Sequence, residues 1–372
     1  MDVTVTPLTD VDALGPVWRE LEERADCSFF QSWTWIGSWL KALPDVSALS
    51  MMTVKNGQTI VGLAVIGRRF ARRHRFVGVR GWFLNETGDP ALDTLTVEHN
   101  GVLMQRGMER LILDAVVRNA LASMARWDEF RLSGIESGNA ELHAAAFAAG
   151  SCTVKSLDQS YFVVRLDEIR QQGRDYLSAL SSNTRSQLRR SLRDYSKNGP
   201  VTLHIAADHA EASDYLAKLR ELHQSYWTER GAPGAFATPF ANSFHRNLLA
   251  TGIPRGEIQL ALIASGEQPI GYLYNFRHRG VVSNYQSGIR YTDDSHLKPG
   301  LTAHQLLIEH SLGAGDSKYD LLMGDQRYKK SLSTEEGRMR YLTVQRNRLR
   351  FRVEDAARAL VHRLRRRETA AD

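Results

Sequence analysis

The chain has 372 residues, and its 42% hydrophobic and 24% charged residues are ordinary proportions for a globular protein. Two cysteines exclude a disulfide framework, and no cysteine or histidine spacing is typical of a metal site, so we expect no metal. No apolar run is long enough to cross a membrane, and the first ten residues lack the features of a secretory signal. We therefore expect a cytoplasmic protein without a membrane span.

The net charge of +6 is concentrated in three basic clusters, at residues 68–75, 185–193 and 363–367. Basic clusters attract phosphate groups of nucleotide cofactors, nucleic acids or membrane surfaces. A solvated face without any partner explains each cluster equally well.

The first part of the chain predicts a hairpin, a helix and a strand. Residues 48–66 read as two strands around an Asn-Gly turn, and residues 93–104 read as a further strand. Residues 107–126 have the apolar spacing of a helix, and residues 127–135 form the expected closing strand.

The later part predicts the same order of elements. Residues 257–289 alternate between apolar and polar side chains in three runs separated by Xaa-Gly turns, which is typical of an antiparallel meander. A helix is expected from Leu301 to the glycines at 313 and 315, followed by a buried strand from residue 318.

A short pattern is common to the two hairpins. "NGQTIVG" occupies residues 56–62 and "SGEQPIG" occupies residues 265–271, with glycines at the same relative positions. Together with the shared order of elements, this repeat favours two copies of one α/β unit within the chain.

Longer motifs carry a family resemblance. They are, in chain order, "SSNTRSQLRRSLRDYSKNG", "LHQSYWTERGAPGAF", "PIGYLYNFRHRGVVSNYQSGI", "KPGLTAHQLLIEH" and "YDLLMGDQRYKKSL". Residues 150–345 resemble the double-GNAT acetyltransferases associated with cellulose biosynthesis, which are similar to the Fem-type aminoacyl transferases. The resemblance implies an α/β fold of mixed sheets with a tandem duplicated GNAT unit. We expect an N-terminal GNAT-like domain at 1–165, a C-terminal GNAT domain at 166–345 and a basic helix and tail at 346–372.

The resemblance also implies an acyl donor, with acetyl-CoA or another acyl-CoA as the expected co-substrate. GNAT enzymes hold the donor pyrophosphate with a Gln/Arg-x-x-Gly-x-Gly/Ala loop, and neither half of this chain has that loop intact. "HLKPG" stands in its place in the second half. Free N–H groups at a helix N-terminus, a lysine and a glycine suit a phosphate, so Lys298, Gly300, Leu301 and Thr302 are the predicted cofactor-binding residues. A plain Pro-Gly helix entry is the alternative.

Residues just after the final buried strand of a GNAT unit face the reacting thioester. Here Asp325 is expected to accept a proton or orient an amine, and Tyr328 to act as general acid. Lys329 is expected to bind an anionic group of the substrate. A simple turn at Gly-Asp would explain the same residues without a site.

Two further segments supply the predicted substrate-binding residues. Polar residues on both faces of a half-buried strand suggest a pocket lining at Asn284, Tyr285 and Gln286. The loop around Trp227 and Arg230 combines an aromatic ring with a guanidinium that suits a carboxylate. An edge strand and a helix end are the corresponding structural explanations.

Residues 183–197 predict an amphipathic basic helix with Asn183 as its N-cap and arginines at 185, 189 and 193 on one face. This helix and Arg363–Arg367 leave tRNA open as a partner. In the first half, Glu98 and Asn100 are expected on one side of a strand with His99 opposite, where Glu98 and His99 can form an acid–base pair.

Three functions therefore remain after the sequence. The first is a GNAT acyltransferase that moves an acyl group from acyl-CoA to an amine or hydroxyl of a small molecule, glycan or peptide, with envelope or polysaccharide biosynthesis as the expected setting. The second is a Fem-like transferase that uses aminoacyl-tRNA. The third is a non-catalytic GNAT-like scaffold.

Overall fold

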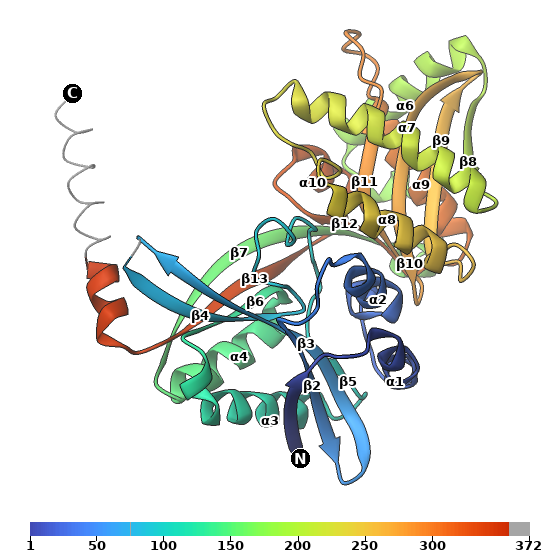
Figure 1. Ribbon diagram of the computed structural model, residues 1–372. Helices are drawn as coiled ribbons and strands as arrows, with labels where there is room; N and C mark the ends of the chain where they lie inside the picture. Colours follow the sequence, from blue (N-terminus) through green and yellow to red (C-terminus); the bar gives the residue numbers. More distant parts are fainter. Residues whose placement is uncertain (75, 357–372) are drawn as a thin grey trace, which may run out of the picture.

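The computed structural model describes residues 1–74 and 76–356. The first half of the chain forms a three-strand meander flanked by helices and completed by further strands (Figure 1). Its elements are β1 (Asp2–Pro7), α1 (Val11–Glu23), η1 (Phe29–Gln31), α2 (Trp33–Ala42), β2 (Leu49–Asn56), β3 (Thr59–Arg73), β4 (Val77–Leu84), β5 (Leu103–Met104), α3 (Glu109–Ala122), η2 (Met124–Arg126), β6 (Glu129–Glu136), α4 (Ser137–Ala149) and β7 (Cys152–Arg165).

A helical connection leads to the second half, which repeats the order of the first. The connection consists of α5 (Leu166–Gln171), η3 (Leu177–Ala179), α6 (Ser182–Tyr195) and η4 (Ser196–Asn198). The second half contains β8 (Val201–Ile205), α7 (His209–Thr228), α8 (Pro239–Gly252), β9 (Ile258–Ser265), β10 (Gln268–His278), β11 (Val281–Ile289), α9 (Pro299–Gly313), β12 (Lys318–Met323), α10 (Arg327–Leu332) and β13 (Glu335–Arg346). Residues 349–356 are helical, and the predicted basic tail at 363–367 lies outside the described residues.

All of these strands belong to one sheet, in the order β1-β2-β3-β4-β6-β13-β7-β12-β11-β10-β9-β8, with β5 paired to β3. Within each half, the strand before the main helix and the strand after it run parallel, as β4 with β6 and β11 with β12. The last strand of each half crosses to the other: β7 pairs with β12, and β13 pairs with β6. Strand pairing therefore crosses the predicted boundary at residue 165 in both directions, and the boundary stays a prediction.

The repeated sequence pattern encodes the same bulged hairpin twice. Gly57 and Gly266 have φ values of 62° and 57°, which glycine adopts without strain, in the turns between β2 and β3 and between β9 and β10. Four residues after each turn glycine the register shifts by one residue, at Val61 in β3 and Ile270 in β10. Each bulge is followed by a glycine, and an added Cβ at Gly271 would lie 2.9 Å from a backbone oxygen.

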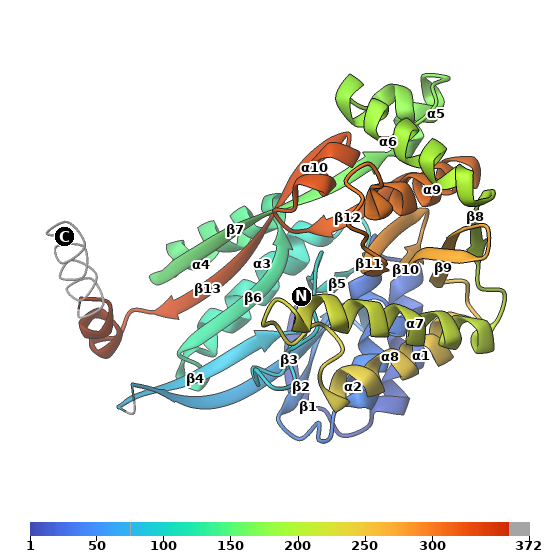
Figure 2. The ribbon, with the colours of Figure 1, turned by 90° about the horizontal axis from the view of Figure 1, so that it is seen from above.

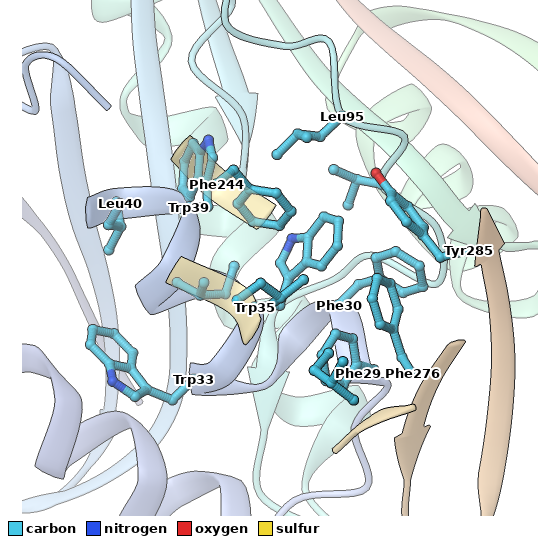
Figure 3. Packing of buried hydrophobic residues seen from close by; sticks show 14 of the residues in the cluster. Phe29, Phe30, Trp33, Trp35, Trp39, Leu40, Leu95, Phe244, Phe276 and Tyr285 are labelled. Atoms are coloured by element: carbon cyan, nitrogen blue, oxygen red, sulfur yellow. The ribbon is translucent and has the colours of Figure 1, made fainter. Parts of the chain in front are cut away.

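Helices α1, α2, α7 and α8 cover one face of the sheet and share a single apolar core between the halves (Figures 1 and 2). Figure 3 shows its centre, where Trp35 of α2 packs against Phe244 of α8, Phe276 of β10 and Tyr285 of β11. On the other face each half has its own core, under α3 and α4 in the first and under α9 in the second. The shared aromatic core joins the halves on one face, and the exchanged strands join them within the sheet.

Two local expectations from the sequence are wrong. Residues 93–102 form no strand, and the third strand of the first meander is instead β4, at residues 77–84. The N-cap of the basic helix α6 is Ser181 rather than Asn183, because its side chain accepts a hydrogen bond from the Thr184 amide.

The exchange of strands predicts that the halves fold together. A chain that ends at Ser333 lacks β13, and both β6 and β7 then lose a hydrogen-bonded neighbour. We expect this truncated chain to lose the cooperative thermal unfolding transition of residues 1–356, measured by circular dichroism. A truncated chain in which the first half still unfolds cooperatively would contradict the prediction.

Candidate functional site

A cavity of about 670 Å³ opens in the second half, between α7, β11, the N-terminus of α9 and the β12–α10 junction. It forms where β11 and β12 separate. These strands pair in parallel only from Val281 to Ser283 and from Lys318 to Asp320. Beyond that point both strands line the cavity, β11 through Asn284–Ser287 and β12 through Leu322 and Met323. The gap gives access to backbone groups that a regular sheet would keep paired.

The strand β11 bulges at the mouth of this gap. Its register with β10 shifts by one residue at Tyr285, whose ring is 9% exposed and packs on the shared aromatic core. The backbone amide of Thr96, in the first half, donates a hydrogen bond to the Tyr285 phenol oxygen, and Thr96 also lines the cavity. The bulge is thus held from both sides, by the second-half sheet and by the first half.

The N-terminus of α9 forms the end of the cavity where a phosphate is expected. Lys298, Gly300 and Leu301 all line it, and a Cβ added at Gly300 would meet no atom within 4 Å. The Lys298 ammonium has no hydrogen bond or ion pair with any residue that the structure describes. Thr302 is fully buried instead, and its hydroxyl shares a 2.8 Å hydrogen bond with Ser191 of α6. It fixes α9 against α6 and does not reach the cavity.

The segment after β12 places two of its three predicted residues in the cavity. Tyr328 stacks on His304 of α9 with ring centroids 5.4 Å apart, and burial raises the pKa of its phenol. The Lys329 ammonium is buried against the backbone carbonyls of Leu322 and Met323, and burial lowers its pKa. Asp325 is exposed and does not line the cavity.

The other predicted substrate-binding residues are divided between the wall and the rim. Asn284 and Gln286 line the cavity, and the Asn284 amide donates to Asn275 at 2.8 Å. Trp227 lines it near the end of α7. Arg230 lies outside, where its guanidinium stacks on Tyr226 at 3.6 Å and donates to the Tyr226 carbonyl. It therefore orients an aromatic residue of the rim rather than the interior.

Glu98 comes from the first half, and the sequence predicted it as an acid–base partner of His99 rather than as a residue of this cavity. It is 4% exposed and lines the second-half cavity, and its Oε2 accepts a hydrogen bond from the Met323 amide at 2.7 Å. Burial, together with the nearby Asp320 carboxylate, raises its pKa to about 7. In the sequence, Glu98 is a carboxylate next to a histidine, but no local pattern indicates that its side chain enters the second half.

His99, the next residue, joins the halves. Its Nδ1 lies 2.8 Å from Glu136 of β6 and its Nε2 lies 2.8 Å from Asp320 of β12. Burial opposes protonation, but Asp320 and Glu136 outweigh it and raise the His99 pKa to about 10. The imidazolium therefore links the two halves, and it lines a separate cavity of about 530 Å³ between them. The predicted Glu98–His99 acid–base pair is not formed, because the two side chains enter different cavities.

The corresponding gap between β4 and β6 in the first half is bridged. Asn100 of segment 85–102 bridges the two strands, because its side chain donates to the Leu84 carbonyl of β4 at 3.1 Å and its amide donates to the Gly134 carbonyl of β6 at 2.9 Å. The helix α3 also begins with Glu109, whose carboxylate accepts the Gly107 amide and would repel a phosphate. Glu109 lines the separate cavity of about 530 Å³, so the first half has an acidic group where the second half has Lys298 at the start of its main helix.

Comparison with known proteins agrees with this geometry. Residues 182–330 match the acetyltransferase (GNAT) domain family, a range that contains α6, most of the residues that line the second-half cavity and the whole of α9 and β12. No curated protein sequence matches the chain significantly.

Solved structures share the fold of the whole chain at low sequence identity. FemX has a TM-score of 0.59 at 9% identity, over 92% of this chain and 97% of its own. L-PGS from Bacillus licheniformis has a TM-score of 0.54 at 13% identity, over 90% and 92% of the chains. The C-terminal domain of a putative lysylphosphatidylglycerol synthetase from Agrobacterium fabrum has a TM-score of 0.54 at 11% identity, over 95% of each. The fold is a mixed α/β tandem of GNAT type, as the sequence predicted.

The domain match supports a transferase, while the cellulose-associated family is not shown. No helix in the described part of the chain is long and apolar enough to cross a membrane.

The His99 clamp predicts a pH-dependent stability. Because the folded-state pKa is raised from 6.5 to about 10, the stabilisation is complete below pH 6.5 and is lost as the pH rises toward 10. His99→Gln should lower the free energy of unfolding by about 2–3 kcal/mol at pH 6, since charge-assisted hydrogen bonds contribute about 1.5–3 kcal/mol each. The difference from wild type, measured by denaturant unfolding, should shrink near pH 10. His310→Gln, at an exposed position of α9, is the control, and an equal loss at both pH values would contradict the clamp.

Proposed function

We propose that the protein is an N-acyltransferase that binds an acyl-CoA in the second-half cavity and transfers its acyl group to an amine. The observation that carries the proposal is the combination of separated strands β11 and β12 with an open helix N-terminus at the same cavity. A hydroxyl acceptor would use the same geometry. A role in envelope or polysaccharide biosynthesis remains an expectation from the sequence resemblance.

The phosphate end of the donor would lie at the start of α9. Free amides of the first helical turn and the unpaired Lys298 ammonium suit an anion there, although the usual Gly-rich loop is missing. The open space beside Gly300 leaves room for ligand atoms close to the backbone. The Lys298 ammonium would thus provide part of the attraction for phosphate that the usual loop provides through its backbone N–H groups.

The acyl end would lie between Asn284–Ser287 and Met323, beside Tyr328 and Lys329. A phenol whose pKa is raised by burial is a poor source of a full proton, but it remains neutral and donates a hydrogen bond to a developing thiolate. Lys329 places a positive charge near the same region. Much of the rate enhancement would come from positioning the two substrates.

A second candidate donor is aminoacyl-tRNA, favoured by the basic face of α6. Arg189 and Arg190 are exposed, and their guanidinium groups, like that of Arg185, make no hydrogen bond or ion pair to a described residue. The helix lies against α9, where Ser191 accepts the Lys298 amide at 2.9 Å. A polyanion on α6 would therefore lie next to α9, the helix that begins at the cavity.

Thermal stability separates these candidates from the scaffold alternative. A rise in melting temperature with acetyl-CoA supports the acyl-CoA donor, and a rise with aminoacyl-tRNA alone supports the Fem-like reaction. No shift with either would favour a scaffold and overturn both enzyme proposals.

Lys298→Ala should raise the donor KM about 10-fold or more and leave kcat nearly unchanged, since a charge-assisted contact contributes about 1.5–3 kcal/mol. The measurement is release of coenzyme A with acetyl-CoA as the varied substrate. Lys330→Ala removes a neighbouring lysine whose side chain is 74% exposed and lies outside the cavity, so it should behave as wild type. Equal effects of the two changes would contradict a phosphate contact.

Tyr328→Phe should instead lower kcat about 10-fold to 100-fold with little change in donor binding, because only the hydroxyl group is lost. Coenzyme A release gives kcat, and thermal shift with acetyl-CoA gives binding. A variant with wild-type kcat would remove Tyr328 from the reacting end of the site.

A further inference from the structure

The site in the second half includes a carboxylate that the first half contributes. Segment 85–102 leaves β4 and runs to the second half, where Glu98 lines the cavity at the separation of β11 and β12. The two residues that follow Glu98 anchor the segment. Asn100 accepts a 2.9 Å hydrogen bond from Asn85, and His99 binds Glu136 and Asp320. Glu98 is therefore held at a fixed position in the gap.

Its neighbours come from every element packed around it. Asp320 of β12 and Lys329 of α10 act on its charge, as does His99 of its own segment. The phenols of Tyr285 in β11 and Tyr341 in β13 lie close enough to interact with it electrostatically. Carboxylate and ammonium groups around Glu98 thus partly offset one another, and burial dominates.

A structural role alone does not explain a carboxylate at this position. Burying a carboxylate costs free energy. The hydrogen bond that Glu98 accepts from the Met323 amide needs only one acceptor oxygen. A glutamine would accept the same hydrogen bond without the cost of a buried charge. A carboxylate, unlike a neutral amide, can also act as a base through its second oxygen.

We propose that Glu98 is the general base of the second-half site, taking a proton from the acceptor amine as the amine attacks the acyl carbonyl. The inference rests on the proposed N-acyltransferase function and assigns its proton acceptor to the other half of the chain.

The step balances as follows in bonds and protons. The amine nitrogen forms a bond to the acyl carbon, the carbon–sulfur bond breaks, and the nitrogen proton moves to the Glu98 carboxylate. Coenzyme A leaves as a thiolate beside Tyr328. Glu98 then releases its proton to solvent, and the thiolate takes up one proton from solvent, so that amide and free thiol are the products.

A general base has to be ionised before reaction, and the buried Glu98 carboxyl titrates with a pKa of about 7. The rate should therefore be low at pH 5.5 and rise to a plateau above pH 7. The same group disfavours folding in its charged form, so its contribution to stability falls as pH rises from 4.5 toward 7.

The experiment uses the full chain with acetyl-CoA and a panel of primary amines, and measures coenzyme A release from pH 5.5 to 9. Glu98→Gln should lower kcat about 10²-fold to 10⁴-fold and abolish the rise near pH 7, while acetyl-CoA still raises the melting temperature. The matched control is Glu86→Gln. Glu86 is a half-buried first-half carboxylate whose pKa desolvation also raises to about 7, but it lines a different cavity, of about 10 Å³. This control should keep the wild-type kcat and pH profile.

If the Glu98→Gln variant does not fold, the Glu98→Asp variant tests the assignment instead. It withdraws the carboxylate by one methylene, so it should lower kcat while keeping the rise near pH 7. A wild-type kcat and pH profile in the folded Glu98 variants would overturn the assignment and leave the acyltransferase standing. Wild-type protein that binds acetyl-CoA but transfers to no amine would instead overturn N-acyl transfer, and the general base with it.

Discussion

The pairing of β7 with β13 is the constraint on which the rest of the molecule depends. All twelve residues of β13 pair with β7, and each of these strands also completes the sheet of the half to which it does not belong in sequence. Because backbone hydrogen bonds fix register residue by residue, this pairing sets how the two halves are placed relative to each other. The cavity, the His99 clamp and the shared aromatic core all lie within that fixed arrangement.

The two halves have different roles in this arrangement. In the second half, the gap between β11 and β12 is kept open, and Tyr285 is supported from below by Trp35 and Phe276. In the first half, the same gap is occupied by segment 85–102, which then extends to the other half. The first half therefore supports the second-half cavity and contributes Thr96 and Glu98 to its lining.

The sequence predicted the local elements well and the long-range contacts poorly. Gly57 and Gly266 marked their hairpins because a turn with positive φ favours glycine, which is a property of a few neighbouring residues. Alternation of side chains cannot identify a strand's partner, so the crossing of β13 to β6 was not foreseen. The polar–apolar alternation at 93–104 predicted a strand, but those polar groups bond to Asn85, β6 and β12 instead.

The same distinction applies to the site. Lys298, Gly300 and Tyr328 were predicted together because one helix start and one strand end lie close together in the expected fold, and all three line the cavity. Thr302 faces α6 rather than the cavity, a matter of helix rotation that a flanking Pro-Gly does not reveal. Glu98 could not be assigned to the cavity from sequence, since more than two hundred residues separate it from Met323.

A continuous sheet also limits how the molecule can move. Many two-part enzymes admit and release substrates by swinging their halves about a hinge, but here such a motion would break backbone hydrogen bonds of β6–β13 and β7–β12. The exposed loop at residues 290–296 lines the second-half cavity instead, and its Tyr291 stacks on Tyr226 with ring centroids 4.9 Å apart. A movement of this loop that separates the two rings would widen the cavity without breaking any strand pairing of the sheet.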